Sequence, residues 1–174
     1  MKTIGLIGGI SWQSTAEYYR IINQTVAAKL GGNASAKILL YSVNFHEIEE
    51  AQIEGNWEEL AQEFSKIGKI LEGAGADCLL ICANTMHKVA DRVQQNVAIP
   101  LLHIGDVAGT AITQKKMSCV GLLGTRFTMR ESFYKDRLRE KFEIKTLIPT
   151  DSEIEFIYHT IHNELIAGKM VASI

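Results

Sequence analysis

The segment Ile4-Gly5-Leu6-Ile7-Gly8-Gly9 is a short apolar run that ends in two glycines, and Val120-Gly121-Leu122-Leu123-Gly124-Thr125 repeats it. Each copy has the pattern of a strand, a glycine turn and then a helix. A pattern that occurs twice predicts two similar, pseudo-symmetric α/β domains. We place the first domain at residues 1–104, which include Cys82, and the second at residues 105–174.

Apolar strand signals alternate with helix signals along the chain. This alternation predicts an α/β fold with parallel sheets flanked by helices. We expect strands at residues 3–7, 37–43, 77–82, 99–104, 118–123 and 144–148. We expect helices at residues 14–30, 57–72, 85–95, 107–115, 127–142 and 152–167.

Two details of these helices follow from side-chain spacing. Ser14 and Glu17 have capping-box spacing, so we expect Ser14 to cap the first helix. The second helix places five apolar residues on one face, which we expect to be buried. They are Leu60, Phe64, Ile67, Ile70 and Leu71.

The composition is that of an ordinary globular protein, with 47% hydrophobic and 22% charged residues among 174. A net charge of −2 with dispersed Lys and Arg argues against nucleic acid or a membrane surface as a partner. No apolar run reaches membrane-spanning length, and no signal sequence precedes the first strand. Three unpatterned cysteines indicate neither a disulfide framework nor a metal site, so we expect a cytoplasmic protein.

Three segments are predicted at the carboxyl ends of strands, where ligands bind in open α/β sheets. They are Gly8–Ser11, Cys82–Thr85 and Gly124–Thr128. Each precedes a helix, whose free N–H groups suit a carboxylate or phosphate, although turn chemistry alone also explains the glycines. The chain contains neither a Rossmann nor a Walker glycine pattern, which disfavours a nucleotide.

Cys82 is the strongest candidate for a catalytic residue. It lies at a strand end before a helix, where the helix dipole lowers the pKa of a thiol. The alternative is a small buried strand residue, because free cysteines are usually buried. Cys78 and Cys119 lie near strand starts, and we expect them in the core.

Other candidates have a structural alternative. His87 could polarise the thiol or bind substrate, or lie on a helix surface. Gln52 could reach the same cleft, or belong to a solvated helix face. His159 and His162 are one helical turn apart, a spacing that could bind a metal ion, but no third ligand is in view. We therefore expect both to be surface residues. Trp12 is most simply a packing residue.

These residues resemble the aspartate/glutamate racemase family, and most of all its broad-specificity bacterial amino-acid racemases. The resemblance runs the whole length of the chain. Four segments carry it: Gly8–Thr15, Ser42–Glu50, Cys82–Ala90 and Leu123–Met129.

The resemblance implies a cofactor-independent enzyme, with no pyridoxal phosphate, that binds an acidic amino acid or a broader set and forms a homodimer. Two cysteines, one from each domain, act on opposite faces of the substrate α-carbon. Cys82 matches the first. Six further residues match or resemble positions around the substrate: Ser11, Gln52, Asn84, Thr85, Thr125 and Thr128.

The second cysteine of the family lies in a Gly-Cys-Thr-Glu motif, which does not occur here. By the repeat, a counterpart of Cys82 would fall beyond Ile174, so we expect the second domain to be truncated at its C-terminal end. Racemase activity of the 174-residue chain is then expected to be very low or absent. The alternatives are a non-catalytic carboxylate-binding or amino-acid-binding remnant of the same fold and a one-cysteine decarboxylase or isomerase of a dicarboxylate.

Overall fold

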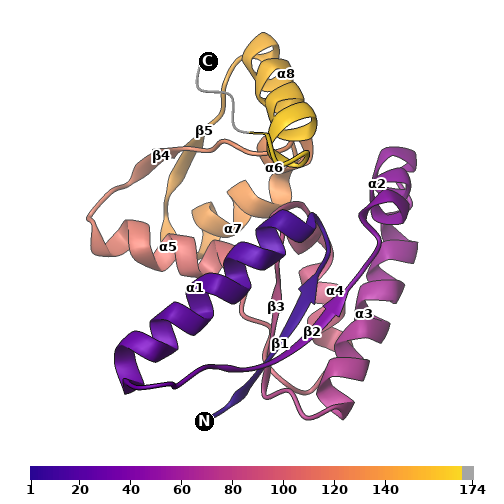
Figure 1. Cartoon of the computed structure of the whole chain (residues 1–174). Helices are drawn as coiled ribbons and strands as arrows, with labels where there is room; N and C mark the ends of the chain where they lie inside the picture. Colours follow the sequence, from indigo (N-terminus) through magenta and orange to yellow (C-terminus); the bar gives the residue numbers. More distant parts are fainter. Residues whose placement is uncertain (170–174) are drawn as a thin grey trace. The chain divides into compact units, whose positions relative to one another are not determined.

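The computed structural model describes residues 1–169 of the chain. The chain divides into two compact units, Met1–Leu102 (unit 1) and His103–Ile174 (unit 2). Each unit contains parallel strands together with several helices (Figure 1). The predicted α/β class with parallel sheets flanked by helices is therefore confirmed.

Unit 1 is built on a parallel sheet with the strand order β2-β1-β3. The strands are β1 (Thr3–Gly8), β2 (Lys37–Ser42) and β3 (Cys78–Ile81). The helices are α1 (Trp12–Leu30), α2 (Phe45–Glu54), α3 (Trp57–Gly73), the 3₁₀ helix η1 (Thr85–Val89) and α4 (Ala90–Asn96). In the central strand, Ile4 pairs with Ile38 of β2 and with Cys78 of β3. Helix α1 lies on one side of the strands, and α2 and α3 lie on the other (Figure 1).

The core of unit 1 lies mainly between α3 and the sheet. Four of the predicted α3 residues are buried: Leu60, Phe64, Ile67 and Leu71. The prediction for Ile70 is wrong, because that side chain is 51% exposed. At about 100° per residue, Ile70 lies roughly 90° from the centre of the stripe that the other four form.

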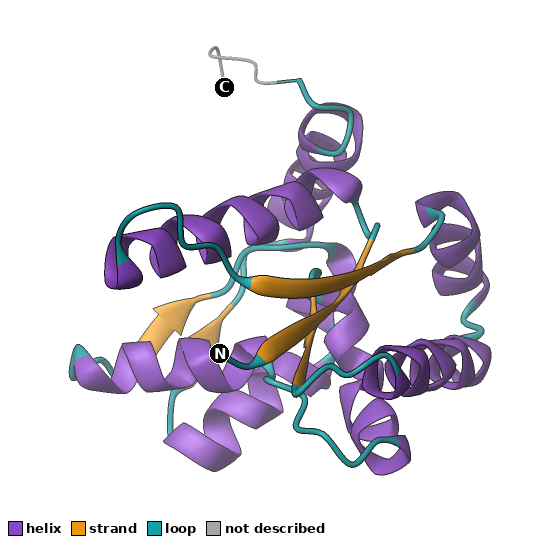
Figure 2. Ribbon diagram, turned by 60° about the horizontal axis from the view of Figure 1, so that its bottom comes forward, coloured by secondary structure: helices purple, strands orange, loops and turns teal. Residues whose placement is uncertain are grey.

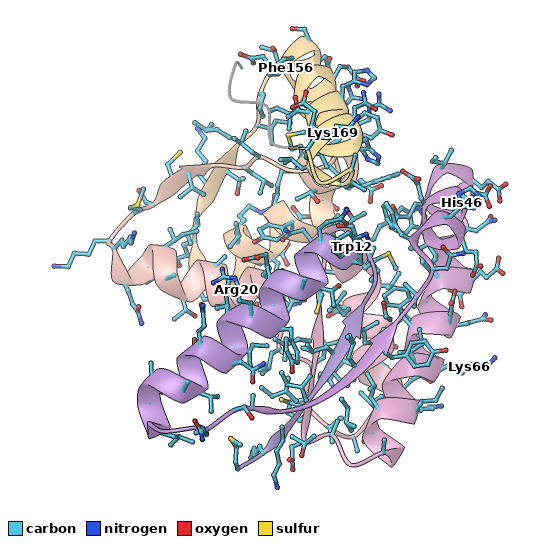
Figure 3. All side chains as sticks on the ribbon, viewed as in Figure 1. Trp12, Arg20, His46, Lys66, Phe156 and Lys169 are labelled. Carbon is cyan, nitrogen blue, oxygen red and sulfur yellow. The ribbon has the colours of Figure 1, made fainter. Side chains whose placement is uncertain are left out.

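Helix α1 begins earlier than we predicted, and one of its residues is more exposed than we predicted. Its N-cap is Ser11, so the predicted cap at Ser14 is wrong. Ser14 lies in the first turn, where its hydroxyl donates to backbone carbonyls, while Glu17 pairs with Arg20 (labelled in Figure 3). The predicted packing role of Trp12 is also wrong, because this side chain is 67% exposed (Figure 3).

The strand predicted at residues 99–104 is reduced to one bridge, between Leu79 and Leu101. The N–H of Leu79 donates to the Pro100 carbonyl, and the N–H of Leu102 donates to the Leu79 carbonyl. Pro100 has no N–H to continue the ladder, and a helix already begins at Ile104. Only one residue of this segment therefore pairs as a strand does.

Up to residue 169, unit 2 contains one pair of short parallel strands (Figure 2). Val120 of the first strand lies opposite Thr146 of the second. The elements of unit 2 are α5 (Ile104–Gln114), β4 (Cys119–Gly121), α6 (Arg126–Arg130), α7 (Ser132–Phe142), β5 (Lys145–Leu147), α8 (Asp151–Thr160) and the π-helical turn η2 (Ile161–Leu165). The helix predicted at 127–142 is two helices, because Glu131 adopts an extended conformation. Tyr134, Leu138 and Ile144 form its small buried cluster.

Candidate functional site

Cys82 lies directly after β3, at the carboxyl end of the unit 1 sheet. Its N–H donates to the carbonyl of Ile7 in β1 at 2.9 Å. Its own carbonyl accepts a hydrogen bond from Ser14 Oγ of α1 at 2.8 Å. The side chain of Cys82 is fully buried. This residue is thus held between β1 and the first turn of α1.

The electrostatic state of Cys82 differs from our expectation. Burial raises the pKa of the Cys82 thiol to about 12, since a thiolate is poorly solvated there. The expected lowering of the pKa is therefore wrong, because burial of the side chain determines the direction of the shift. The helical segment that follows begins with the 3₁₀ helix η1, and only at Thr85.

The loop after Cys82 is held by hydrogen bonds to its carbonyl groups. His87 Nδ1 lies 2.8 Å from the Ala83 carbonyl, and the backbone N–H of His87 donates to the Asn84 carbonyl at 3.0 Å. The surface alternative for His87 is wrong, because it is only 3% exposed. A carbonyl only accepts, so Nδ1 carries a proton in this arrangement. Asn84 is exposed and Thr85 is buried.

The glycine turn after β1 is shaped by close backbone contacts. Gly9 has a φ of 90°, and its N–H donates to Thr15 Oγ1 at 2.9 Å. The Thr15 hydroxyl in turn donates to the carbonyl of Ser11 at 3.0 Å. A Cβ at position 9 would lie 2.3 Å from the Val43 carbonyl oxygen. Only glycine fits here, so turn chemistry is sufficient to explain this residue.

Gln52 of α2 lies inside the unit and not on a solvated helix face, so that alternative is wrong. The side chain is 7% exposed, and Nε2 donates to the sulfur of Met86 in η1 at 3.0 Å. A thioether is a weak acceptor. The Gln52 amide therefore has the capacity to form a stronger hydrogen bond with a ligand oxygen.

In unit 2, Thr125 and Thr128 form the N-terminal turn of α6. Thr125 Oγ1 accepts a hydrogen bond from the Thr128 N–H at 3.3 Å, and their hydroxyl oxygens lie 3.2 Å apart. Thr128 is buried. The two hydroxyls that the sequence placed in one segment thus lie together at a helix start.

Sequence reasoning missed the residues that hold Arg126. Its guanidinium forms an ion pair with Glu155 of α8 and lies 3.6 Å from the centre of the Tyr158 ring. Glu155 also pairs with Arg130, at 3.3 Å. Only Arg126 belonged to a segment we singled out, and nothing in the sequence linked it to partners 29 and 32 positions away.

The remaining candidates are dispersed. Cys119 is exposed and Cys78 is half-buried, so the predicted core position is wrong for Cys119. His159 is exposed, and the ring of His162 packs against Tyr158.

Within residues 1–169, no group of three or more His, Cys, Asp or Glu side chains could hold a metal ion. Nor does that part of the chain contain a helix with the length and hydropathy of a membrane span.

Residues 7–165 match the family model for Asp/Glu/Hydantoin racemase. This match covers most of the chain, including Cys82 and the six polar residues named with it. The chain belongs to this racemase family. The resemblance stated from the sequence is therefore confirmed.

Solved structures of other racemase-like proteins agree with this membership. A Yersinia pestis protein assigned to the Asp/Glu racemases is 48% identical, with a TM-score of 0.91 over 99% of this chain and 75% of its own. An aspartate racemase homologue from Pyrococcus horikoshii OT3 is 35% identical, with a TM-score of 0.83 over 97% of this chain and 74% of its own. The Picrophilus torridus aspartate racemase, at 22% identity, shares the fold, with a TM-score of 0.71 over 97% and 76% of the two chains.

Proposed function

We propose that this chain acts on amino acids as a cofactor-independent racemase of acidic or broader specificity, with Cys82 as the base. The observation that carries this proposal is the position of Cys82 in a family fold. It is the thiol at the carboxyl end of β3, followed by a polar loop whose backbone is tied in place. Ligands bind at this end of parallel sheets.

The proposed reaction starts when the Cys82 thiolate takes the α-proton of the substrate. A pKa of about 12 leaves roughly one thiolate in 10⁵ molecules at pH 7. The same raised pKa makes that thiolate a stronger base toward a weakly acidic C–H bond. A substrate ammonium close to the sulfur would favour the thiolate by direct charge attraction. Inversion also needs an acid on the opposite face, a role that the family resemblance gives to a second cysteine.

Substrate binding is assigned in the same proposal to the polar residues that the family resemblance names. They are Ser11, Gln52, Asn84, Thr85, Thr125 and Thr128. Hydroxyl and amide groups at helix starts are suited to carboxylates. The buried Gln52 amide supports this assignment, because the Met86 sulfur is a weak partner for its N–H group.

Deuterium exchange tests the proposal directly. The purified chain is incubated in D₂O with L- or D-aspartate and L- or D-glutamate, and α-deuterium and enantiomer ratio are measured by NMR and chiral chromatography. We expect α-deuterium incorporation that Cys82→Ser abolishes and the matched Cys119→Ser variant retains. Exchange without inversion would show that Cys82 acts in a one-base reaction. Racemisation would then lack the rate factor of about 10²–10⁴ that a second acid or base group supplies. Equal exchange in Cys82→Ser and the unmodified chain would reject the proposal.

A second candidate function is a binding module for carboxylates or amino acids without catalysis. The complete burial of Cys82 and the raised pKa of its thiol favour this candidate, because both lower the supply of thiolate. Calorimetry with the same four amino acids separates the two functions. Binding without α-proton exchange would identify a binding module.

The proposal includes the homodimer that the family resemblance implies. Helix α1 supports it, since Trp12 and Tyr19, two turns apart on the same side of this helix, expose more than half of their surface. Exposed apolar patches commonly mark interaction sites. Sedimentation velocity of the chain and of a Trp12→Ser variant tests this part, and two monomeric samples would reject it.

A further inference from the structure

We infer that Ser14 and His87 are positioning residues that fix the backbone from Cys82 to Asn84, so that its N–H groups are presented to the ligand. Neither residue is among those matched to the substrate. The inference rests on the proposed function for its ligand, an amino acid with a carboxylate. Its structural part concerns unit 1 alone.

Three consecutive carbonyl groups carry the argument. The Cys82 carbonyl accepts from Ser14 Oγ at 2.8 Å. The Ala83 carbonyl accepts from His87 Nδ1 at 2.8 Å, and the Asn84 carbonyl accepts from the His87 N–H at 3.0 Å. One of these donors belongs to α1 and the other two to η1, so the loop is tied at both sides.

The direction of these carbonyls determines the direction of the adjacent N–H groups. These peptide bonds are trans, and in a trans peptide the C=O and N–H groups point in opposite directions. Holding the carbonyls of Cys82 and Ala83 therefore turns the N–H groups of Ala83 and Asn84 the other way. Within residues 1–169, these two N–H groups have no hydrogen-bond partner. Oriented N–H groups of this kind bind anions.

The hydrogen bonds that the Ser14 and His87 side chains donate are both partly shielded from water, which strengthens them. His87 is 3% exposed, and Ser14 is half-buried. The Ser14 hydroxyl also lies 2.9 Å from the Ser11 carbonyl, so it joins the N-cap of α1 to the Cys82 loop. Removing either donor leaves a carbonyl in a poorly solvated place without its partner, and the peptide plane is then free to rotate.

Paired substitutions separate positioning from general stability. Ser14→Ala and His87→Leu remove the donors. Ser14→Thr keeps a hydroxyl, and His87→Asn keeps an N–H donor near the position of Nδ1. Thr25→Ala is the matched control, because Thr25 also donates to a carbonyl of α1, that of Ile21 at 2.8 Å, but is not bonded to the loop.

The experiment is a titration of the ¹⁵N-labelled chain with L-aspartate, followed through the backbone amide signals, with calorimetry for affinity. We expect the Ala83 and Asn84 amides to move on binding. Ser14→Ala and His87→Leu should each weaken affinity about five- to tenfold, as expected for one lost hydrogen bond. Ser14→Thr and His87→Asn should restore most of it, and Thr25→Ala should match the unmodified chain.

The outcomes distinguish this inference from the proposed function. Binding by the unmodified chain with equal affinity in Ser14→Ala and His87→Leu would overturn the positioning role alone. No binding of any of the four aspartate and glutamate enantiomers would reject the proposed function. In that case the ligand-free spectra decide: Ala83 and Asn84 amide signals that shift in the two variants and recover in the conservative ones support positioning. Unchanged signals in those spectra overturn it.

Discussion

The guanidinium of Arg137 in α7 donates two hydrogen bonds to the Asp106 carboxylate of α5, at 2.6 and 2.7 Å. Lys141 adds a third at 3.1 Å. The Arg137 hydrogen bonds are the main cause that lowers the pKa of Asp106 to about 2 from its ordinary 3.8. This cluster ties the first helix of unit 2 to α7, beside the small core around Leu138.

The pKa of Asp106 predicts how the stability of unit 2 depends on pH. A carboxyl with a lowered pKa stabilises the folded state above about pH 4, and this contribution is lost as the pH falls toward 2. Asp106→Asn should reduce the free energy of unfolding at pH 6 by about 1 kcal/mol, since the partly exposed pair is screened by solvent. Urea unfolding at pH 6 and at pH 3 checks this, and the difference should shrink at pH 3.

Glu140→Gln is the control for that measurement, because Glu140 forms an exposed ion pair with Arg139 on the same helix. It should change stability little at either pH. A loss as large as that of Asp106→Asn would show that the effect is one of net charge and not of the Asp106 cluster.

Much of the fold could be predicted because it depends on neighbouring residues. The apolar run before Gly8 predicts a strand, and the stripe through Leu60 and Phe64 predicts the buried face of a helix. The position of Cys82 at a strand end follows from the same local pattern. The match of residues 7–165 to the family model likewise depends on the sequence and needs no knowledge of packing.

What could not be predicted depends on contacts between distant segments. The pKa of Cys82 is set by how completely the folded unit excludes water, and no spacing reports that. The spacing of Ser14 and Glu17 predicts a helix cap, but the Ser14 hydroxyl donates to the Ser11 carbonyl and to the carbonyl of Cys82, 68 positions away. The helix break at Glu131 likewise could not be predicted, because no glycine or proline lies near it in the sequence.

The turn at Gly9 should be far more sensitive to substitution than another glycine with a positive φ. Gly9→Ala should cost more than about 3 kcal/mol, because backbone strain adds to an overlap with the Val43 carbonyl. Gly55→Ala is the matched control: its φ is 78°, but a Cβ there would meet no atom within 4 Å. It should cost about 1–2 kcal/mol. Similar losses in urea unfolding would contradict the close contact at Gly9.

Glu155 should stabilise the packing of α6 against α8. It pairs with Arg126 and Arg130, and the Arg126 hydrogen bond is the main cause that lowers the pKa of Glu155. Glu155→Gln should therefore lower the melting temperature, by about 2 °C at low salt, with a smaller difference in 1 M salt. Glu164→Gln, a residue with no ion pair within residues 1–169, is the control. A salt-independent loss would argue against the ion pairs as its cause.

The thiols of Cys119 and Cys82 should differ in reactivity in an order that follows exposure. Cys119 is exposed, whereas Cys82 is fully buried and has a thiol pKa raised to about 12 from an ordinary 9.0. Three pKa units correspond to about a thousandfold less thiolate than an ordinary thiol has at pH 7. Iodoacetamide labelling with peptide mapping at pH 7 should therefore modify Cys119 first, and labelling of Cys82 should rise with pH. The two sites should react alike in 8 M urea. Faster labelling of Cys82 than of Cys119 in the folded chain at pH 7 would mean that the Cys82 thiol is solvent-accessible and ionised, which conflicts with its burial.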